Sequence, residues 1–154
     1  MRKEIIAIGI IAMIAVCATL AMAAPSNSQK DVTATSVAEA VIEIKLDNDI
    51  LNLQSNGKYV TVLIYEVVDY ELEDVNVDTV NLIYDGVVLA AVDPDAPTYI
   101  RDCDGDGDVE LMVKFDRAAV QGMLVAGEEV EITISGEVAG IVFEGTDIIR
   151  IMDN

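Results

Sequence analysis

The sequence predicts an all-β protein, an antiparallel β-sandwich of about seven to eight strands with one short helix. The first observation is that the chain beyond residue 37 is rich in valine and isoleucine, which favour strands. The second is that several short segments alternate apolar and polar residues, the period of a half-buried strand. The third is that turn signals recur about every eight to twelve residues. A chain of 154 residues has room for one such domain and little more.

Residues 1–24 predict an export signal or a membrane anchor. Arg2 and Lys3 supply a positive start, residues 5–24 are apolar, and Ala21-Met22-Ala23 fits a small-x-small cleavage site. The apolar run is also long enough to span a bilayer, so a cleaved signal peptide and a retained N-terminal anchor both stay open. In either case we expect a secreted or cell-surface protein that contacts the membrane only through residues 5–24, and only if they are retained.

The domain itself is expected to follow a short lead-in. Residues 25–37 are mostly small and polar and predict a flexible lead-in to a sandwich domain of residues 38–154. The first strand is expected in segment 40–46, which alternates apolar and polar residues. The side chains predicted to face the core there are Ala40, Ile42, Ile44 and Leu46. Segment 59–65 is apolar at nearly every position and is expected to be buried on both faces or nearly so.

The middle of the chain carries a hairpin signal and a helix signal. Asp85-Gly86 lies between two apolar runs, which predicts a tight hairpin. Asp116 can cap a helix of one or two turns over residues 117–121, and Gly122 can end it.

Three further segments predict strands. Residues 109–115 are typical of a strand, and residues 130–134 alternate cleanly, with the valine and two isoleucines facing inward. Residues 141–152 predict a closing hairpin that turns near Gly145.

The charge and the missing residue types exclude several functions. The formal net charge is −19 at pH 7, and such a surface repels phosphate backbones, so no nucleic-acid binding is expected. The chain has no histidine, which removes most hydrolase triads, the usual zinc sites and the commonest general base near neutral pH. We therefore expect no enzyme activity. Beyond the N-terminal segment Cys103 is the only cysteine, so no intramolecular disulfide is expected there.

The stretch R-D-C-D-G-D-G-D-V-E, residues 101–110, concentrates carboxylates in one short loop. Their mutual repulsion disfavours a compact loop unless a cation binds. Calcium takes six to eight oxygen ligands at about 2.3–2.6 Å, and carboxylates at alternate positions of a curled loop can converge on one point. The residues predicted to form a calcium site are Asp102, Asp104, Asp106, Asp108 and Glu110.

Each position of this acidic loop has an expected role. The aspartates at positions 1, 3 and 5 supply side-chain oxygens, and Gly107 at position 6 allows the sharp turn. Asp108 is expected to supply its backbone carbonyl, and Glu110 to coordinate directly or through a water molecule.

The setting of the loop differs from that of an EF-hand, which has a glutamate at position 12 and continues into a helix. Here that position is Val113, inside a predicted strand. Magnesium is disfavoured because it dehydrates reluctantly and prefers stricter octahedral geometry. The alternatives to calcium are a solvated acidic turn without an ion and a site for another divalent cation.

Three other aspartates have weaker signals. Asp93 and Asp95 are predicted turn residues, set by Pro94 and Pro97, with an outer-shell carboxylate near the loop as the alternative. Asp147 is a predicted turn acceptor, with a place near the ion as the alternative.

The order of motifs resembles an uncharacterised secreted domain of bacteria and archaea that recurs in extracellular and cell-surface proteins. The segments that carry the resemblance are I-E-I-K (42–45), N-L-Q-S-N-G (52–57), V-D-T-V (77–80), D-C-D-G-D-G-D (102–108) and F-E-G-T-D-I-I-R-I (143–151). It extends from about residue 40 to residue 152, and only the acidic loop is a specific motif.

The resemblance implies a calcium-stabilised accessory module with no established activity, and the expected sandwich is immunoglobulin-like or cohesin-like. The acidic loop is also locally similar to the calcium loops of dockerins and thrombospondin-type repeats, which carry several loops where this chain has one. The chain departs from the family at Leu46-Asp47, where the family usually has Pro-Gly.

We therefore expect an extracellular calcium-binding β-sandwich with a structural or adhesive, non-catalytic role. One alternative is a subunit of a cell-surface assembly or filament, tethered by a retained N-terminal helix. Another is a recognition module for a cell-surface protein or a glycan. The absence of tryptophan, with five tyrosines and two phenylalanines, weakens the glycan version because few rings are available to stack on sugars.

Overall fold

The computed structural model describes residues 36–46 and 49–154. The predicted signal or anchor in residues 1–24 lies outside the described residues, as does the predicted lead-in up to residue 35. The described residues group as one compact unit. Within the described ranges, no helix is long and apolar enough to cross a membrane.

The predicted all-β class is confirmed, with nine strands and one short α-helix in the part of the chain that the structure describes. The strands are β1 (Val37–Lys45), β2 (Ile50–Asn52), β3 (Tyr59–Val67), β4 (Val75–Tyr84), β5 (Val87–Ala91), β6 (Tyr99–Arg101), β7 (Glu110–Asp116), β8 (Gly127–Val138) and β9 (Ile141–Met152). The helical elements are α1 (Arg117–Gln121) and the 3-10 turn η2 (Leu72–Asp74). β2 and β6, of three residues each, bring the count above the expected seven to eight.

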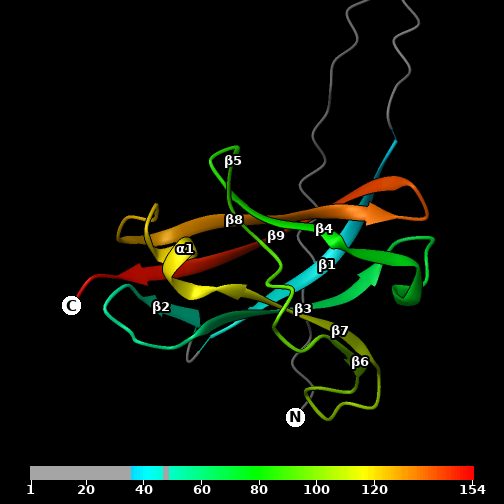
Figure 1. Ribbon diagram of the computed structural model, residues 1–154, viewed down its shortest axis with the longest axis horizontal. Helices are drawn as coiled ribbons and strands as arrows, with labels where there is room; N and C mark the ends of the chain where they lie inside the picture. Colours follow the sequence, from blue (N-terminus) through cyan, green and yellow to red (C-terminus); the bar gives the residue numbers. More distant parts are fainter. Residues whose placement is uncertain (1–35, 47–48) are drawn as a thin grey trace, which may run out of the picture. The chain divides into compact units, whose positions relative to one another are not determined.

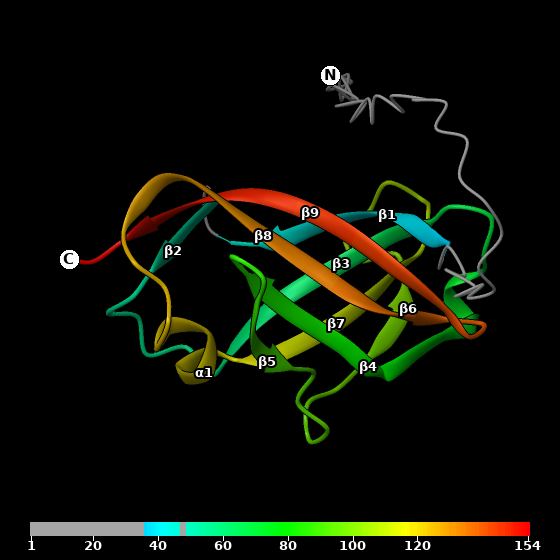
Figure 2. The same cartoon turned by 90° about the horizontal axis from the view of Figure 1, so that it is seen from above.

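The strands form one folded-over sheet with the order β5-β4-β8-β9-β1-β3-β7-β6, and β2 pairs with β9. Figure 1 shows β4, β8 and β9 in one layer and β3 and β7 in the other, and Figure 2 shows the strands of the two layers crossing. The arrangement is sandwich-like, but the pairing is mixed. β1 and β2 both run parallel to β9, whereas all other neighbours are antiparallel.

β1 belongs to both layers. Its residues 37–39 pair with β9, and its residues 40–45 pair with β3. The change of partner occurs beside Gly145, where an added Cβ would lie 2.5 Å from the Ala40 carbonyl oxygen. Only glycine allows the two backbones to approach this closely.

The predicted turn near Gly145 is therefore wrong. Residues 141–152 form one uninterrupted strand, and the chain turns instead at Ala139-Gly140, both with positive φ (49° and 79°). Asp147 also lies in the strand rather than in a turn, and its Oδ2 accepts a hydrogen bond from the Ile44 N–H at 2.8 Å. This contact gives the β1 backbone a partner on β9 after the ladder between the two strands has ended.

Most of the remaining local predictions are confirmed. Asp85 and Gly86 both have positive φ (49° and 74°) and join β4 to β5. The Asp116 carboxylate accepts a hydrogen bond from the Ala119 N–H at 2.9 Å and so caps α1, which ends at Gly122.

The core lies between the two layers and is formed by the apolar residues of the alternating segments. Residues 62–64 of β3 are all buried, which confirms the prediction that this strand is covered on both faces. The alternation predicted seven inward residues, namely Ala40, Ile42, Ile44, Leu46, Val130, Ile132 and Ile134. All are buried except Leu46, which lies just after β1 and is only partly buried against the core. Phe115 and Phe143 are fully buried in this core. Their strands, β7 and β9, belong to opposite layers (Figure 1).

We expect Gly145→Ala to lower the free energy of unfolding by about 3 kcal/mol, because the new methyl group meets backbone that cannot move away without breaking the shared strand. Urea unfolding followed by circular dichroism measures the change. Thr146→Ala, an exposed change in the same strand, is the control and should have little effect. Equal stability of the two variants would contradict the close approach of β1 to β9.

Candidate metal site

The acidic loop is the connection of an antiparallel hairpin. β6 ends at Arg101 and β7 begins at Glu110, and these two residues are paired in register. Residues 102–109 therefore leave and re-enter the sheet at neighbouring positions. A loop with ends so close must curl on itself, which brings its side chains together.

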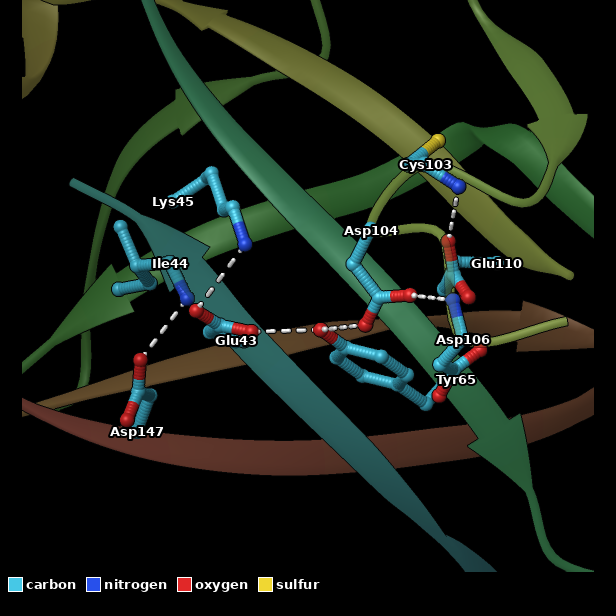
Figure 3. Close-up of polar contacts among 9 residues, drawn as sticks. All are labelled: Glu43, Ile44, Lys45, Tyr65, Cys103, Asp104, Asp106, Glu110 and Asp147. Atoms are coloured by element: carbon cyan, nitrogen blue, oxygen red, sulfur yellow. Dashed lines mark hydrogen bonds and ion pairs between the residues drawn. The ribbon is translucent and has the colours of Figure 1, made fainter. Parts of the chain in front are cut away.

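Four of the five residues predicted to bind calcium gather at one point. One carboxylate oxygen from each of Asp102, Asp104, Asp106 and Glu110 lies within 4.8 Å of the others, a grouping that can hold a metal ion. Figure 3 shows Asp104, Asp106 and Glu110 from this group. The Asp108 side chain is not part of it, and the predicted role of the Asp108 backbone carbonyl stays a prediction.

The loop is shaped by its own aspartates. Asp102 accepts hydrogen bonds from the backbone N–H groups of Gly105 (2.5 Å) and Gly107 (3.1 Å). The Asp106 N–H donates to Asp104 at 3.1 Å, and the Asp108 N–H donates to Asp106 at 2.9 Å. Such bonds to the residues that follow are typical of aspartate in turns. They orient the carboxylates toward the inside of the loop.

The two glycines make this curl possible. Gly105 and Gly107 have φ values of +86° and +103°, a region that residues with a Cβ rarely adopt. No heavy atom lies within 4 Å of a Cβ placed at either position, so the backbone conformation and not crowding requires glycine.

Glu110 differs from the three aspartates because it is fully buried, with an exposed fraction of 0 %. Along β7, Glu110 alternates with the core residues Leu111, Val113 and Phe115. It therefore lies on the face of the β3–β7 layer that points away from the core. Its Oε2 accepts a hydrogen bond from the Cys103 N–H at 2.7 Å, which ties the start of the loop to the strand that follows it. Its Oε1 is buried without a hydrogen-bond partner.

A buried carboxylate oxygen without a partner is costly, because burial removes the water that would stabilise its charge. No lysine or arginine among the described residues forms an ion pair with this carboxylate. The two ion pairs among residues 36–46 and 49–154 are Lys45–Glu43 and Arg150–Glu128, and neither includes the acidic loop. A cation at the centre of the group would compensate both the burial of Glu110 and the repulsion among the four carboxylates.

The four gathered residues, Asp102, Asp104, Asp106 and Glu110, are called the metal group below. Tyr65 lies beside this group, although no motif in the sequence indicates this. It is the extra residue of a β-bulge: Ile64 pairs with Ile42 and Glu66 with Val41, which leaves Tyr65 unpaired. Bulges redirect side chains. The Tyr65 hydroxyl lies 2.5 Å from the Glu43 Oε2, to which it can donate, and 3.5 Å from the Asp104 Oδ2 (Figure 3).

Burial and the hydrogen bond to Glu43 raise the pKa of Tyr65 well above its ordinary value. The hydroxyl therefore stays protonated across the physiological range and remains a donor next to the metal group. Pairs such as Tyr65 and Asp104 are distant in the sequence, so only the folded sheet shows that they are close.

The weaker aspartate predictions have different outcomes. Asp93 is a turn residue as expected, since it accepts the Asp95 N–H at 2.9 Å, and neither of them belongs to the metal group. Asp147 is also outside this group. Burial raises the pKa of Asp147, while the hydrogen bonds from the Ile44 and Ile148 N–H groups act in the opposite direction. Figure 3 shows the Ile44 contact.

Comparison with known proteins gave no match, either among family models or among curated sequences. The chemistry of the site is therefore inferred from its own atoms. An all-carboxylate donor set suits hard cations such as calcium, magnesium or manganese.

We expect Glu110→Gln to raise the free energy of unfolding of the metal-free protein by about 1–2 kcal/mol, because it removes an unpartnered buried charge. The glutamine carbonyl can still accept the Cys103 N–H. Thermal melts in a chelating buffer measure the change, with Glu137→Gln, an exposed carboxylate of β8, as the control. Destabilisation of the metal-free protein by Glu110→Gln would show that the carboxylate is satisfied without an ion.

Proposed function

We propose that this protein is an extracellular calcium-binding β-sandwich module with a structural or adhesive role and no catalytic activity. The observation that carries the proposal is the buried, unpartnered Oε1 of Glu110 in a group of four carboxylates. An exposed acidic turn would leave all its carboxylates hydrated. Burial of one of them needs a compensating charge, which a bound cation supplies.

Calcium is favoured over other cations by the donor set and by the flexibility of the loop. It accepts six to eight oxygens in irregular geometry, so it can add backbone carbonyls and water to the four carboxylates. Magnesium prefers octahedral geometry and keeps most of its water. The chain has no histidine, so the nitrogen ligand that softer metals favour is absent.

The role that fits this position is a clamp on the β6–β7 hairpin. The ion would hold the loop closed against β7, whose core residues pack between the layers. Extracellular modules often bind calcium with a Kd of about 10⁻⁴–10⁻³ M, which suits a permanent stabiliser in a calcium-rich fluid better than a signal sensor. The extracellular setting rests on the apolar segment 5–24, and the resemblance to secreted domains supports it.

We expect about 5 mM calcium to stabilise the full chain by about 2 kcal/mol, for a Kd of about 10⁻⁴ M, and to raise the melting temperature by about 5 °C. Asp104→Asn/Asp106→Asn should abolish this rise, because it removes two ligand charges and keeps oxygens that can accept the loop's own N–H groups. Differential scanning calorimetry with calcium and with EGTA measures both.

The matched control is Asp93→Asn/Asp95→Asn, which removes two aspartates from the neighbouring turn and should leave the calcium response intact. A melting temperature that calcium does not change in the wild-type protein would reduce the loop to an acidic turn. An equal loss of response in both double variants would point to general charge screening.

A second prediction uses Tyr65 as an internal reporter. Terbium occupies calcium sites and emits when a nearby tyrosine transfers energy to it, and the chain has no tryptophan to compete. Because the Tyr65 hydroxyl lies 3.5 Å from an Asp104 oxygen, Tyr65→Phe should remove most of the sensitised emission. Tyr84→Phe should not, and calcium should displace the terbium. Full emission from Tyr65→Phe would place the ion elsewhere.

A further inference from the structure

An open groove of about 470 Å³ lies beside the acidic loop. One wall is formed by Asp106, Asp108 and Val109 of the loop, and another by the segment between β3 and β4 that includes η2. Tyr65 of β3 and Val41 of β1 also line it. The groove thus borders the acidic loop and also reaches residues of β1, β3 and the β3–β4 segment.

The charges that line the groove are all of one sign. Five carboxylates face it, and none of its lining residues is basic. Three of the carboxylates lie outside the metal group and its loop, namely Glu66, Glu71 and Glu73, and all three are exposed. A groove with several carboxylates and no counter-charge attracts a cationic side chain.

The groove also offers apolar and aromatic surface. Tyr65 and Tyr70 are half-buried in its walls, and Val41 and Val109 leave 49 % and 51 % of their surface exposed. An arginine fits this combination, because its stem packs on apolar surface and its guanidinium stacks on tyrosine and bonds to carboxylates through two parallel hydrogen bonds. A lysine lacks the planar group for both of these contacts.

We propose that this groove docks an arginine-bearing segment of a partner protein. The proposal rests on the calcium-loaded loop of the proposed function, since loop residues form one wall. The partner is a different protein from this one: a chain with 28 acidic and 9 basic residues repels its own copies, whereas a basic partner is attracted. In a structural or adhesive role, this groove would be the surface that recognises the partner.

The test titrates the purified full chain, in saturating calcium, with a blocked pentapeptide that carries two arginines, and measures heat by isothermal titration calorimetry. We expect saturable one-to-one binding that weakens about tenfold or more in Glu66→Gln/Glu71→Gln/Glu73→Gln, because charge-assisted hydrogen bonds are lost. The matched control is Glu129→Gln/Glu131→Gln/Glu144→Gln, which removes the same charge from exposed positions on β8 and β9 and should change the affinity less than about twofold.

Non-saturable binding by the wild-type protein, or equal weakening in both triple variants, would overturn the groove and leave only non-specific attraction to an acidic surface. The same peptide with glutamine in place of arginine should not bind, a control that leaves the protein unchanged. The calcium melt is run on each variant. A failed calcium response with selective peptide binding would refute the calcium clamp alone, and a normal response without selective peptide binding would refute the groove alone.

Discussion

The close approach of β1 to β9 at Gly145 is the constraint on which the rest of the structure depends. Because one strand pairs first with β9 and then with β3, the two layers are parts of one hydrogen-bonded sheet rather than separate sheets held by side chains alone. The core between them, and the outward face that carries Glu110, are positioned by this shared strand. The hydrogen bond from Ile44 to Asp147 completes the transfer.

The sequence signals that succeeded are local ones. The alternation of segments 40–44 and 130–134, the hairpin at Asp85-Gly86 and the cap of α1 at Asp116 each depend on a few neighbouring residues, so they can be recognised without the fold. Gly145 was predicted as a turn for the same reason. A glycine that permits a turn and a glycine that permits close packing look alike in a sequence, and only the strand crossing over it distinguishes them.

The metal group shows the same division. The spacing of the aspartates predicted which residues come together, because a short curled loop brings alternate positions to one centre. The burial of Glu110 could not be predicted, since it depends on the loop start lying against β7 through the Cys103 N–H. The contributions of Tyr65 and Glu43 depend on a bulge between two strands, and the sequence carries no signal for its position.

The direction of β9 relative to β1 also determines how the domain would carry a mechanical load. In a parallel pair, the N-terminal end of one strand and the C-terminal end of its neighbour lie at opposite ends of the pair. A pull between the chain entering at Val37 and the chain leaving after Met152 therefore slides the two strands along each other. In shear, the hydrogen bonds between the two strands resist the pull together. If the strands were antiparallel, the same two ends would lie side by side, and the pull would break the hydrogen bonds one after another.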